Sequence, residues 1–406
     1  MWTPPPRSAE ARALYSAAES ERACRPELFV LGAQTILAAA FARSQLPAGD
    51  DGDWKAGFHA YIDSAREEGR LNALGMRSMV GTAVAKLQAR AKISTTLAEN
   101  PQVRTRTIDR PIFIIGGWRT GTTLLQRLLD GVPGLRGAMP SELSVPWRFL
   151  DLEAGARATL IVAGEGAHQR LHALNPQMQQ VHPSGGRLAE ECVLAMGSDF
   201  RNWGFTSTLR CPSYANWLLT QDTAPSYRTY ADILRMLQDT SGRRWVLKAP
   251  AHTAALPALW AAFPDAIVLH LHRDVVETVT SGASLFAVFR STYSDAVDPA
   301  EVGRYQLDMT AEWFRRAMAA RDAHPGQKVI DIAFRDLVAD PVGLVRKLCA
   351  ACDVAWDEAA QAAAEDRLAS LNRQHGPHKY APEDFGLEPG EIRERLAGYA
   401  SAFGLG

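Results

Sequence analysis

Four short apolar runs constrain the fold of this chain most strongly. They occupy residues 112–115, 245–247, 267–271 and 329–332, and sequence with helical periodicity flanks each of them. Strands this short and apolar, alternating with helices, are typical of a parallel sheet buried on both faces. The sequence therefore predicts an α/β fold of three layers with a mostly parallel central sheet. Ligands of such folds bind outside the carboxyl ends of the strands.

The first hundred residues have a different texture. Ala-rich segments that also carry Arg and Glu, such as 9–23 and 26–43, predict helices. They contain no acidic or histidine cluster that would indicate chemistry. We therefore expect a helical N-terminal region over residues 1–105, which caps an α/β domain over residues 106–406; 406 residues suffice for both.

Composition excludes several classes of protein. The formal net charge of -1 argues against sequence-independent binding to nucleic acid. Five cysteines are too few and odd in number for a disulfide framework, and Cys349 and Cys352 form a C-x-x-C within a predicted helix, where we interpret them as small buried hydrophobes. No signal peptide is evident, and the apolar stretch 28–42 is too short to span a bilayer. The sequence predicts a cytoplasmic protein without a membrane span.

A glycine-rich loop follows the first apolar run. It reads Gly-Gly-Trp-Arg-Thr-Gly-Thr-Thr over residues 116–123 and leads into an amphipathic helix. Glycines allow a tight turn that presents backbone N–H groups, and the positive end of the helix adds to their attraction for phosphate or sulfate. The spacing is that of a Walker A loop, but Thr122 stands where a nucleotide hydrolase has Lys, and the basic residue is Arg119. The loop predicts a P-loop-like fold.

Two further strand ends carry cations. Lys248 ends the second run, and Arg273 follows the third, with Ser281 eight residues later. An Arg fork suits a phosphate dianion. No metal-ligand cluster accompanies these residues, and no Asp ends a strand as in a Walker B motif. The pattern indicates phosphate-rich chemistry carried by side chains and backbone, without metal.

These motifs resemble those of the sulfotransferase superfamily, and more closely its large bacterial branch. The family pattern R-[ST]-G-T-T is matched by Arg119, Thr120, Gly121, Thr122 and Thr123. In the family it binds the 5′-phosphosulfate of the donor, 3′-phosphoadenosine 5′-phosphosulfate (PAPS). The family's Arg and Ser for the 3′-phosphate are matched by Arg273 and Ser281. The resemblance implies a PAPS-dependent sulfotransferase that acts on a hydroxyl or phenol of a small molecule.

The resemblance also suggests catalytic residues. The segment around Lys248 is similar to one that carries a catalytic Lys in the tyrosylprotein branch, and Glu142 lies near that branch's offset for a Glu base. The cytosolic branch uses a His two residues after its strand-end Lys; here Pro250 has that place and His252 lies two residues further on. We expect Arg119 and Lys248 to stabilise developing charge, and Glu142, ahead of His252, to be the base.

Other assignments stay open at the level of sequence. Trp203, Phe205, Tyr214 and Trp217 could line an apolar acceptor pocket or belong to the core. Glu190 and Glu191 are expected to orient neighbouring elements, although they could contact an acceptor, and Lys379 could contact a donor phosphate. A phosphoryl-transferring P-loop enzyme and a nucleotide-binding protein without catalysis are the alternatives. The acceptor and the oligomeric state are not predicted.

Overall fold

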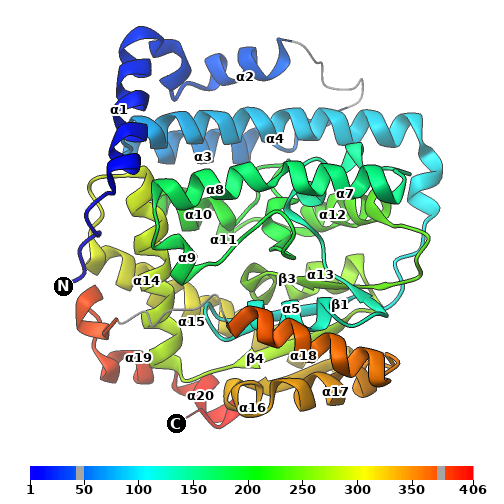
Figure 1. Cartoon of the computed structure of the whole chain (residues 1–406). Helices are drawn as coiled ribbons and strands as arrows, with labels where there is room; N and C mark the ends of the chain where they lie inside the picture. Colours follow the sequence, from blue (N-terminus) through cyan, green and yellow to red (C-terminus); the bar gives the residue numbers. More distant parts are fainter. Residues whose placement is uncertain (43–49, 373–379, 406) are drawn as a thin grey trace.

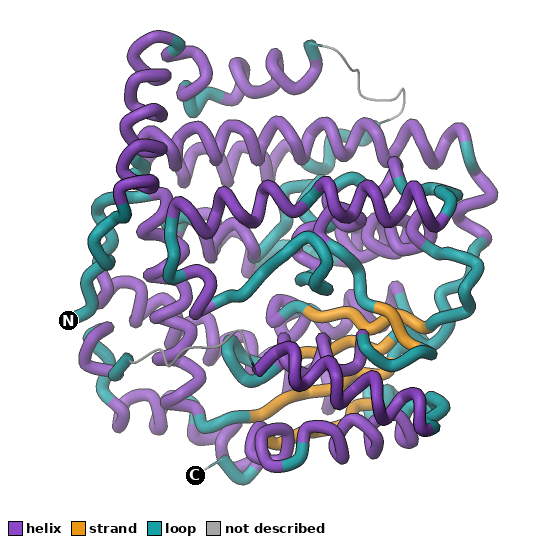
Figure 2. Tube along the Cα trace, in the orientation of Figure 1, coloured by secondary structure: helices purple, strands orange, loops and turns teal. Residues whose placement is uncertain are grey.

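The computed structural model describes residues 1–42, 50–372 and 380–405 and is built around a five-stranded parallel sheet (Figures 1 and 2). The strand order is β2-β3-β1-β4-β5. The bounds are Ile112–Gly116 for β1, Leu135–Arg136 for β2, Arg244–Lys248 for β3, Ile267–His272 for β4 and Val329–Ala333 for β5. The α/β prediction is confirmed, and four strands match the four apolar runs. The two-residue β2 was not predicted, because it is too short to leave a pattern.

Both faces of the sheet are covered by helices, which makes three layers. Ile112 and Ile114 of β1 face one cluster, whereas Phe113 and Ile115, the alternate residues, face the other. The first cluster includes α5 (Thr122–Asp130), α17 (Pro341–Ala351) and α18 (Glu358–Asn372). The second includes α12 (Ala224–Leu237), α13 (Leu256–Ala262), α14 (Val275–Tyr293) and α15 (Pro299–Ala323). Burial on both faces explains why the strands are continuously apolar.

The N-terminal region is helical, as predicted. Its helices are α1 (Ala9–Cys24), α2 (Ala33–Phe41), α3 (Lys55–Glu68) and α4 (Ala73–Glu99), the last a long helix that lies across the molecule in Figure 1. Asn72 caps α4, since its side chain accepts a hydrogen bond of 2.8 Å from the N–H of Gly75. Gly75 lets α4 approach α14 closely, because a Cβ atom there would stand 2.1 Å from the carbonyl oxygen of Tyr293.

The N-terminal helices and the α/β part share one hydrophobic core. Phe58 of α3 and Leu87 of α4 are fully buried in the same cluster as Phe113 of β1. The boundary between residues 105 and 106 stays a prediction. Both thiols of the C-x-x-C, on Cys349 and Cys352, are 1% exposed, in line with a packing role, and burial raises the pKa of Cys349 to about 12. Over the ranges described, no helix has the length and apolarity to cross a membrane.

Smaller helices fill the connections between these layers. They are α6 (Pro140–Ser144), α7 (Ala154–Ala163), α8 (Glu165–Leu174), α9 (Met178–Val181), α10 (Gly204–Thr208), α11 (Pro212–Leu219), α16 (Phe334–Ala339), α19 (Pro389–Arg395) and α20 (Ala397–Phe403). The long connection from β2 to β3 contains α6 to α12 and brings 3-10 turn Cys192–Leu194 beside the sheet edge. It supplies most of the residues that the site needs beyond the strand ends.

Candidate active site

The glycine-rich loop joins β1 to α5 in a turn with three positive φ angles. Gly116 and Gly121 have φ of 143° and 90°, values that side chains other than glycine rarely adopt. Arg119 also has a positive φ, 61°, in the left-handed region. The hydroxyl of Thr253 accepts from the N–H of Gly116 over 3.1 Å and so attaches the loop to the 3-10 turn Pro250–Ala254 that follows β3. Strain concentrated in one turn is a common property of ligand sites.

A cavity of about 250 Å³ opens at this loop. Five residues predicted from the family motifs line it: Arg119, Gly121, Thr122, Thr123 and Arg273. The helix α5 begins at Thr122, so its free N–H groups and positive end lie at the cavity. We call this the donor cavity.

The donor cavity is electropositive. Arg119, Arg127 and Arg273 line it, against a single carboxylate, Glu191, among the described lining residues. Burial lowers the pKa of Arg119, and its guanidinium donates to the carbonyl of Val181 over 2.6 Å. A bound anion would compensate the hydration that this partly buried arginine has lost.

Arg273 is positioned by three neighbours. Its guanidinium donates to the backbone carbonyl of Arg119 over 2.8 Å and to Glu277 over 2.6 Å, and it lies 4.3 Å from the ring centre of Phe334. The contact with Arg119 couples the end of β4 directly to the glycine-rich loop. The predicted meeting of these two strand ends at one cavity is therefore observed.

Two of the predicted donor-binding residues do not line this cavity in the described structure. Thr120 is 1% exposed, and its hydroxyl donates to the carbonyl of Gly117 over 2.8 Å, which stabilises the loop from within. Ser281 is 2% exposed within α14. Lys379 lies outside the described residues. The roles of Thr120 and Ser281 in donor binding stay predictions.

Lys248 is buried behind the cavity rather than on its surface. Its ammonium is 0% exposed and donates to Glu191 over 2.7 Å. Glu191 in turn lines the donor cavity, so Lys248 reaches the site through this carboxylate. Removal of Glu191 would leave the buried ammonium of Lys248 without this partner, which is costly.

Glu142, the base expected from the sequence, is committed to structural partners. It accepts from Arg136 over 2.8 Å, from Arg157 over 2.7 Å and from the N–H of Met139 over 2.8 Å at the start of α6. Its side chain is 1% exposed. It lies in none of the described cavities, and structural donors occupy three of the roughly four lone-pair sites of its carboxylate. This placement does not support Glu142 as the base.

His252, the second candidate, is also buried away from the cavity surface. It is 0% exposed and shares a hydrogen bond of 2.6 Å with the hydroxyl of Tyr227. Burial and the charge of Lys248 lower the pKa of His252 to about 3. A base this weak takes up a proton poorly near neutrality. The adjacent Pro250 and Ala251 line the cavities in its place.

Four residues of the site were not assigned to it from the sequence. Arg127, His182, Glu190 and Glu191 line the donor cavity or its continuation. His182 lies 3.3 Å from Glu190; although burial raises the pKa of Glu190, His182, Lys248 and Arg127 bring it well below its usual value. The available signal was the Glu190-Glu191 pair in the long β2–β3 connection, for which we expected an orienting role and left an acceptor contact open.

A second, larger cavity adjoins the first. It has a volume of about 320 Å³ and shares Trp118, His182, Glu191, Pro250 and Leu285 with the donor cavity. Together with aliphatic and polar residues, its further lining includes five aromatic side chains: Trp203, Phe205, Phe286, Phe289 and Trp313. We call it the acceptor cavity.

The aromatic segment predicted as pocket or core serves both purposes. Trp203 and Phe205 line the acceptor cavity. Tyr214 belongs to the core, where it is 0% exposed and donates to the carbonyl of Phe200 over 2.7 Å, and Trp217 stacks on it.

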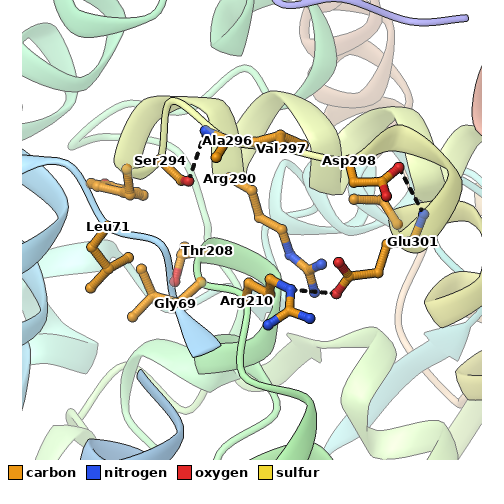
Figure 3. A pocket seen from close by; sticks show the side chains of 13 residues that line it. Gly69, Leu71, Thr208, Arg210, Arg290, Ser294, Ala296, Val297, Asp298 and Glu301 are labelled. Atoms are coloured by element: carbon orange, nitrogen blue, oxygen red, sulfur yellow. Dashed lines mark hydrogen bonds and ion pairs between the residues drawn. The ribbon is translucent and has the colours of Figure 1, made fainter. Parts of the chain in front are cut away.

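Two smaller spaces continue from the acceptor cavity toward the N-terminal helices. A space of about 100 Å³ shares Thr82, Phe205 and Thr208 with it. Beyond lies a space of about 10 Å³, room for one water, where Arg210 pairs with Glu301 over 2.5 Å (Figure 3). Figure 3 shows Arg290 pointing toward the same ion pair. Each of these spaces thus shares lining residues with the next.

One group of possible metal ligands occurs among the described residues. Ring nitrogens of His270 and His272 and a carboxylate oxygen of Asp331 lie within 4.8 Å of one another. Asp331 is already held by two bonds from Arg321, of 2.7 and 2.8 Å, and His272 bonds to Asp331 and Tyr399. An arginine fork on the only carboxylate disfavours a cation there. The network attaches α20 to β4 and β5.

The fold and the cationic loop define the class of protein: the chain belongs to the sulfotransferase family, whose model matches residues 111–358. Among curated proteins it is similar to the omega-hydroxy-beta-dihydromenaquinone-9 sulfotransferase Stf3 of Mycobacterium bovis and of Mycobacterium tuberculosis, each 26% identical over 251 residues. The match covers 59% of this chain and 62% of those relatives.

Solved structures extend the similarity to nearly the whole chain. Sulfotransferase STF1 from Mycobacterium tuberculosis H37Rv is 27% identical with a TM-score of 0.77, and the match covers 90% of this chain and 98% of that one. Sulfotransferase STF9 from Mycobacterium avium, at 22% identity, shares the fold, with a TM-score of 0.80 over 93% of this chain and 98% of that one. These matches include most of the N-terminal helical region.

Proposed function

We propose that the protein transfers the sulfuryl group of PAPS to a hydroxyl of an elongated, largely apolar small molecule. The observation that carries this proposal is the junction of the two cavities: the cationic donor cavity meets the aromatic acceptor cavity at His182 and Glu191. Two substrates bound in these cavities would have their reacting groups side by side at one carboxylate. Holding reactants in this way supplies much of the catalysis of a bimolecular transfer.

The donor cavity fits the phosphates of PAPS. We assign the 5′-phosphosulfate to Arg119, to the hydroxyls of Thr122 and Thr123 and to the N–H groups that begin α5. Arg273 would bind the 3′-phosphate, together with Ser281 as the family motif implies. Donors fixed at the site of the leaving phosphate stabilise its growing charge without reorganisation.

We propose that Glu191, rather than Glu142 or His252, removes the proton of the acceptor. It is the carboxylate that lines both cavities, and Lys248 holds it in place. The acceptor oxygen attacks sulfur as its proton passes to Glu191, and the bond from sulfur to the bridging phosphate oxygen breaks. The products are a sulfate ester and adenosine 3′,5′-bisphosphate. The positive charges of Lys248 and Arg119 would stabilise the negative charge that develops on the sulfuryl group and on the leaving phosphate.

The acceptor class follows from the shape and chemistry of the acceptor cavity. Its aromatic walls and the further spaces beyond Thr208 favour an apolar body longer than a simple phenol. The relative Stf3 is named for a hydroxylated menaquinone, which supports an apolar alcohol for this chain too.

The test is a reaction of PAPS with a panel of long-chain alcohols, prenyl alcohols and phenols, followed by mass spectrometry. We expect sulfate esters of the apolar alcohols and an equal amount of adenosine 3′,5′-bisphosphate. We also propose that no metal takes part, so prior dialysis against EDTA should leave the rate unchanged. A protein that binds the bisphosphate but esterifies none of these acceptors would instead be a nucleotide-binding protein.

A further inference from the structure

A lysine from the N-terminal region stands in the wall of the acceptor cavity. Lys86 belongs to α4 and lines this cavity together with Thr82, one turn earlier on the same helix. The cavity wall around them is otherwise mostly apolar, with Val193, Leu194 and Phe205 among its residues. An ammonium in such surroundings has lost water that its neighbours must replace.

The partners of Lys86 leave its charge uncompensated. It donates to the carbonyls of Leu194 over 2.7 Å and Met196 over 2.6 Å, and both are neutral acceptors. Within the described ranges no carboxylate lies within 4.0 Å of its ammonium. An ammonium has three N–H donors, so one remains for a ligand.

The nearest acid that affects Lys86 is committed elsewhere. Asp199 raises its pKa by charge, but this carboxylate pairs with Arg201 over 3.2 Å and accepts from Ser226 over 2.5 Å. Burial outweighs this effect and lowers the pKa of Lys86 to about 8, so the ammonium is still charged at neutral pH. A charged group kept in an apolar wall without an ion-pair partner is a feature that ligands exploit.

From this geometry we propose that Lys86 binds a carboxylate on the acceptor, so that the substrate is an apolar hydroxy acid whose hydroxyl reacts at Glu191. This inference rests on the proposed function and adds to it the second polar group of the acceptor. A carboxylate would accept a hydrogen bond from the free N–H and neutralise the charge of this half-buried lysine in one contact. The N-terminal helical region would then contribute directly to acceptor selection, through α4.

The test compares ω-hydroxy fatty acids with n-alkanols of the same chain length, using full-length protein and PAPS. For one chain length we expect kcat/KM of the hydroxy acid to exceed that of the alkanol. Lys86→Met should lower kcat/KM for the hydroxy acid about ten- to a hundredfold, the value of a hydrogen bond between charged groups. It should leave the alkanol within a few-fold.

Controls separate this role from a structural one. Lys86→Arg keeps the charge and should retain most of the preference, whereas Lys92→Met removes an exposed lysine of the same helix and should change neither substrate. Equal losses for acid and alkanol in Lys86→Met would show that Lys86 only holds the Leu194–Met196 backbone, and would overturn the proposal. So would a wild-type protein that prefers the alkanol.

The same experiment distinguishes failure of this proposal from failure of the proposed function. Sulfation of alkanols without preference for hydroxy acids would refute the carboxylate site and leave the transferase intact. Absence of every ester, with adenosine 3′,5′-bisphosphate still bound in calorimetry, would refute the transferase and with it the proposal for Lys86.

Discussion

The ammonium of Lys248 lies 2.7 Å from the carboxylate of Glu191, and the lysine is fully buried while the glutamate lines both cavities. The pair joins the end of β3 to the turn that begins at Cys192. A strand-end lysine without access to the cavity can thus influence a reaction there through the carboxylate that lines both cavities.

Loss of Lys248 should therefore affect turnover more than donor binding. In Lys248→Ala, Glu191 loses its ion-pair partner. The site also loses the positive charge that would stabilise the negative charge developing on the sulfuryl group. We expect affinity for adenosine 3′,5′-bisphosphate to stay within a few-fold and most of kcat to be lost. Calorimetry and initial rates at saturating donor measure the two effects. A variant that binds the bisphosphate far worse, yet turns over normally at saturation, would refute this role.

Glu191→Gln should remove the base while it keeps an acceptor for Lys248. General-base catalysis is worth typically ~10²–10⁴-fold, so we expect a loss of that order in kcat with donor-product affinity preserved. His252→Ala should cost far less.

Glu142→Gln is the matched comparison for Glu191→Gln. Glu142 joins two arginines, and breaking a buried pair typically costs about 3–5 kcal/mol, with less for an amide that can still accept hydrogen bonds. We expect a lower midpoint of urea unfolding but nearly normal kcat for the folded protein. If the folded Glu142→Gln protein is inactive and Glu191→Gln is active, the assignment made from the sequence is right and ours is wrong.

Donor selectivity should depend on Arg273. A hydrogen bond to a charged group contributes about 1.5–3 kcal/mol, so Arg273→Ala should weaken the binding of adenosine 3′,5′-bisphosphate by about one to two orders of magnitude. An analogue without the 3′-phosphate should be hardly affected. Arg335→Ala, which removes an exposed arginine next to Phe334, the ring that Arg273 contacts, is the control. Equal losses for both ligands would place the 3′-phosphate elsewhere.

The acceptor preference should depend on pH. The pKa of Lys86 is lowered to about 8, so its side chain is protonated and charged below that pH and becomes neutral above it. A fatty carboxylate stays ionised over this range. The ratio of kcat/KM for hydroxy acid and alkanol should thus fall as pH rises through about 8.

A ratio is needed because other groups titrate in the same cavity. His168, His182, Glu190 and Glu191 also line it, and Asp199 acts on Lys86. Groups that take part in the reaction act on both substrates and cancel in the ratio. Lys86→Met should make the ratio independent of pH, and a persistent fall in that variant would assign the titration to another group.

The sequence predicted the sheet and the meeting of Arg119 and Arg273 at one cavity, for physical reasons. Buried parallel strands are continuous apolar runs, and Arg119 and Arg273 follow them directly, so topology alone brings both to one edge. The sequence could not place residues of the long β2–β3 connection. Glu191 reaches the cavity through the packing of segments that are distant in the sequence, and no local sequence pattern distinguishes it from Glu142. The pairing of Glu142 with Arg136 and Arg157 likewise cannot be recognised from the sequence alone.

The most direct test of the account is transfer itself. PAPS labelled with ³⁵S in its sulfuryl group is incubated with the protein and a long-chain alcohol or ω-hydroxy fatty acid, and the products are separated by chromatography. We predict label in an ester of the acceptor, one adenosine 3′,5′-bisphosphate per ester, and loss of both in Glu191→Gln. Label that stays in PAPS or appears only as free sulfate with every acceptor, while the bisphosphate binds tightly, would contradict it.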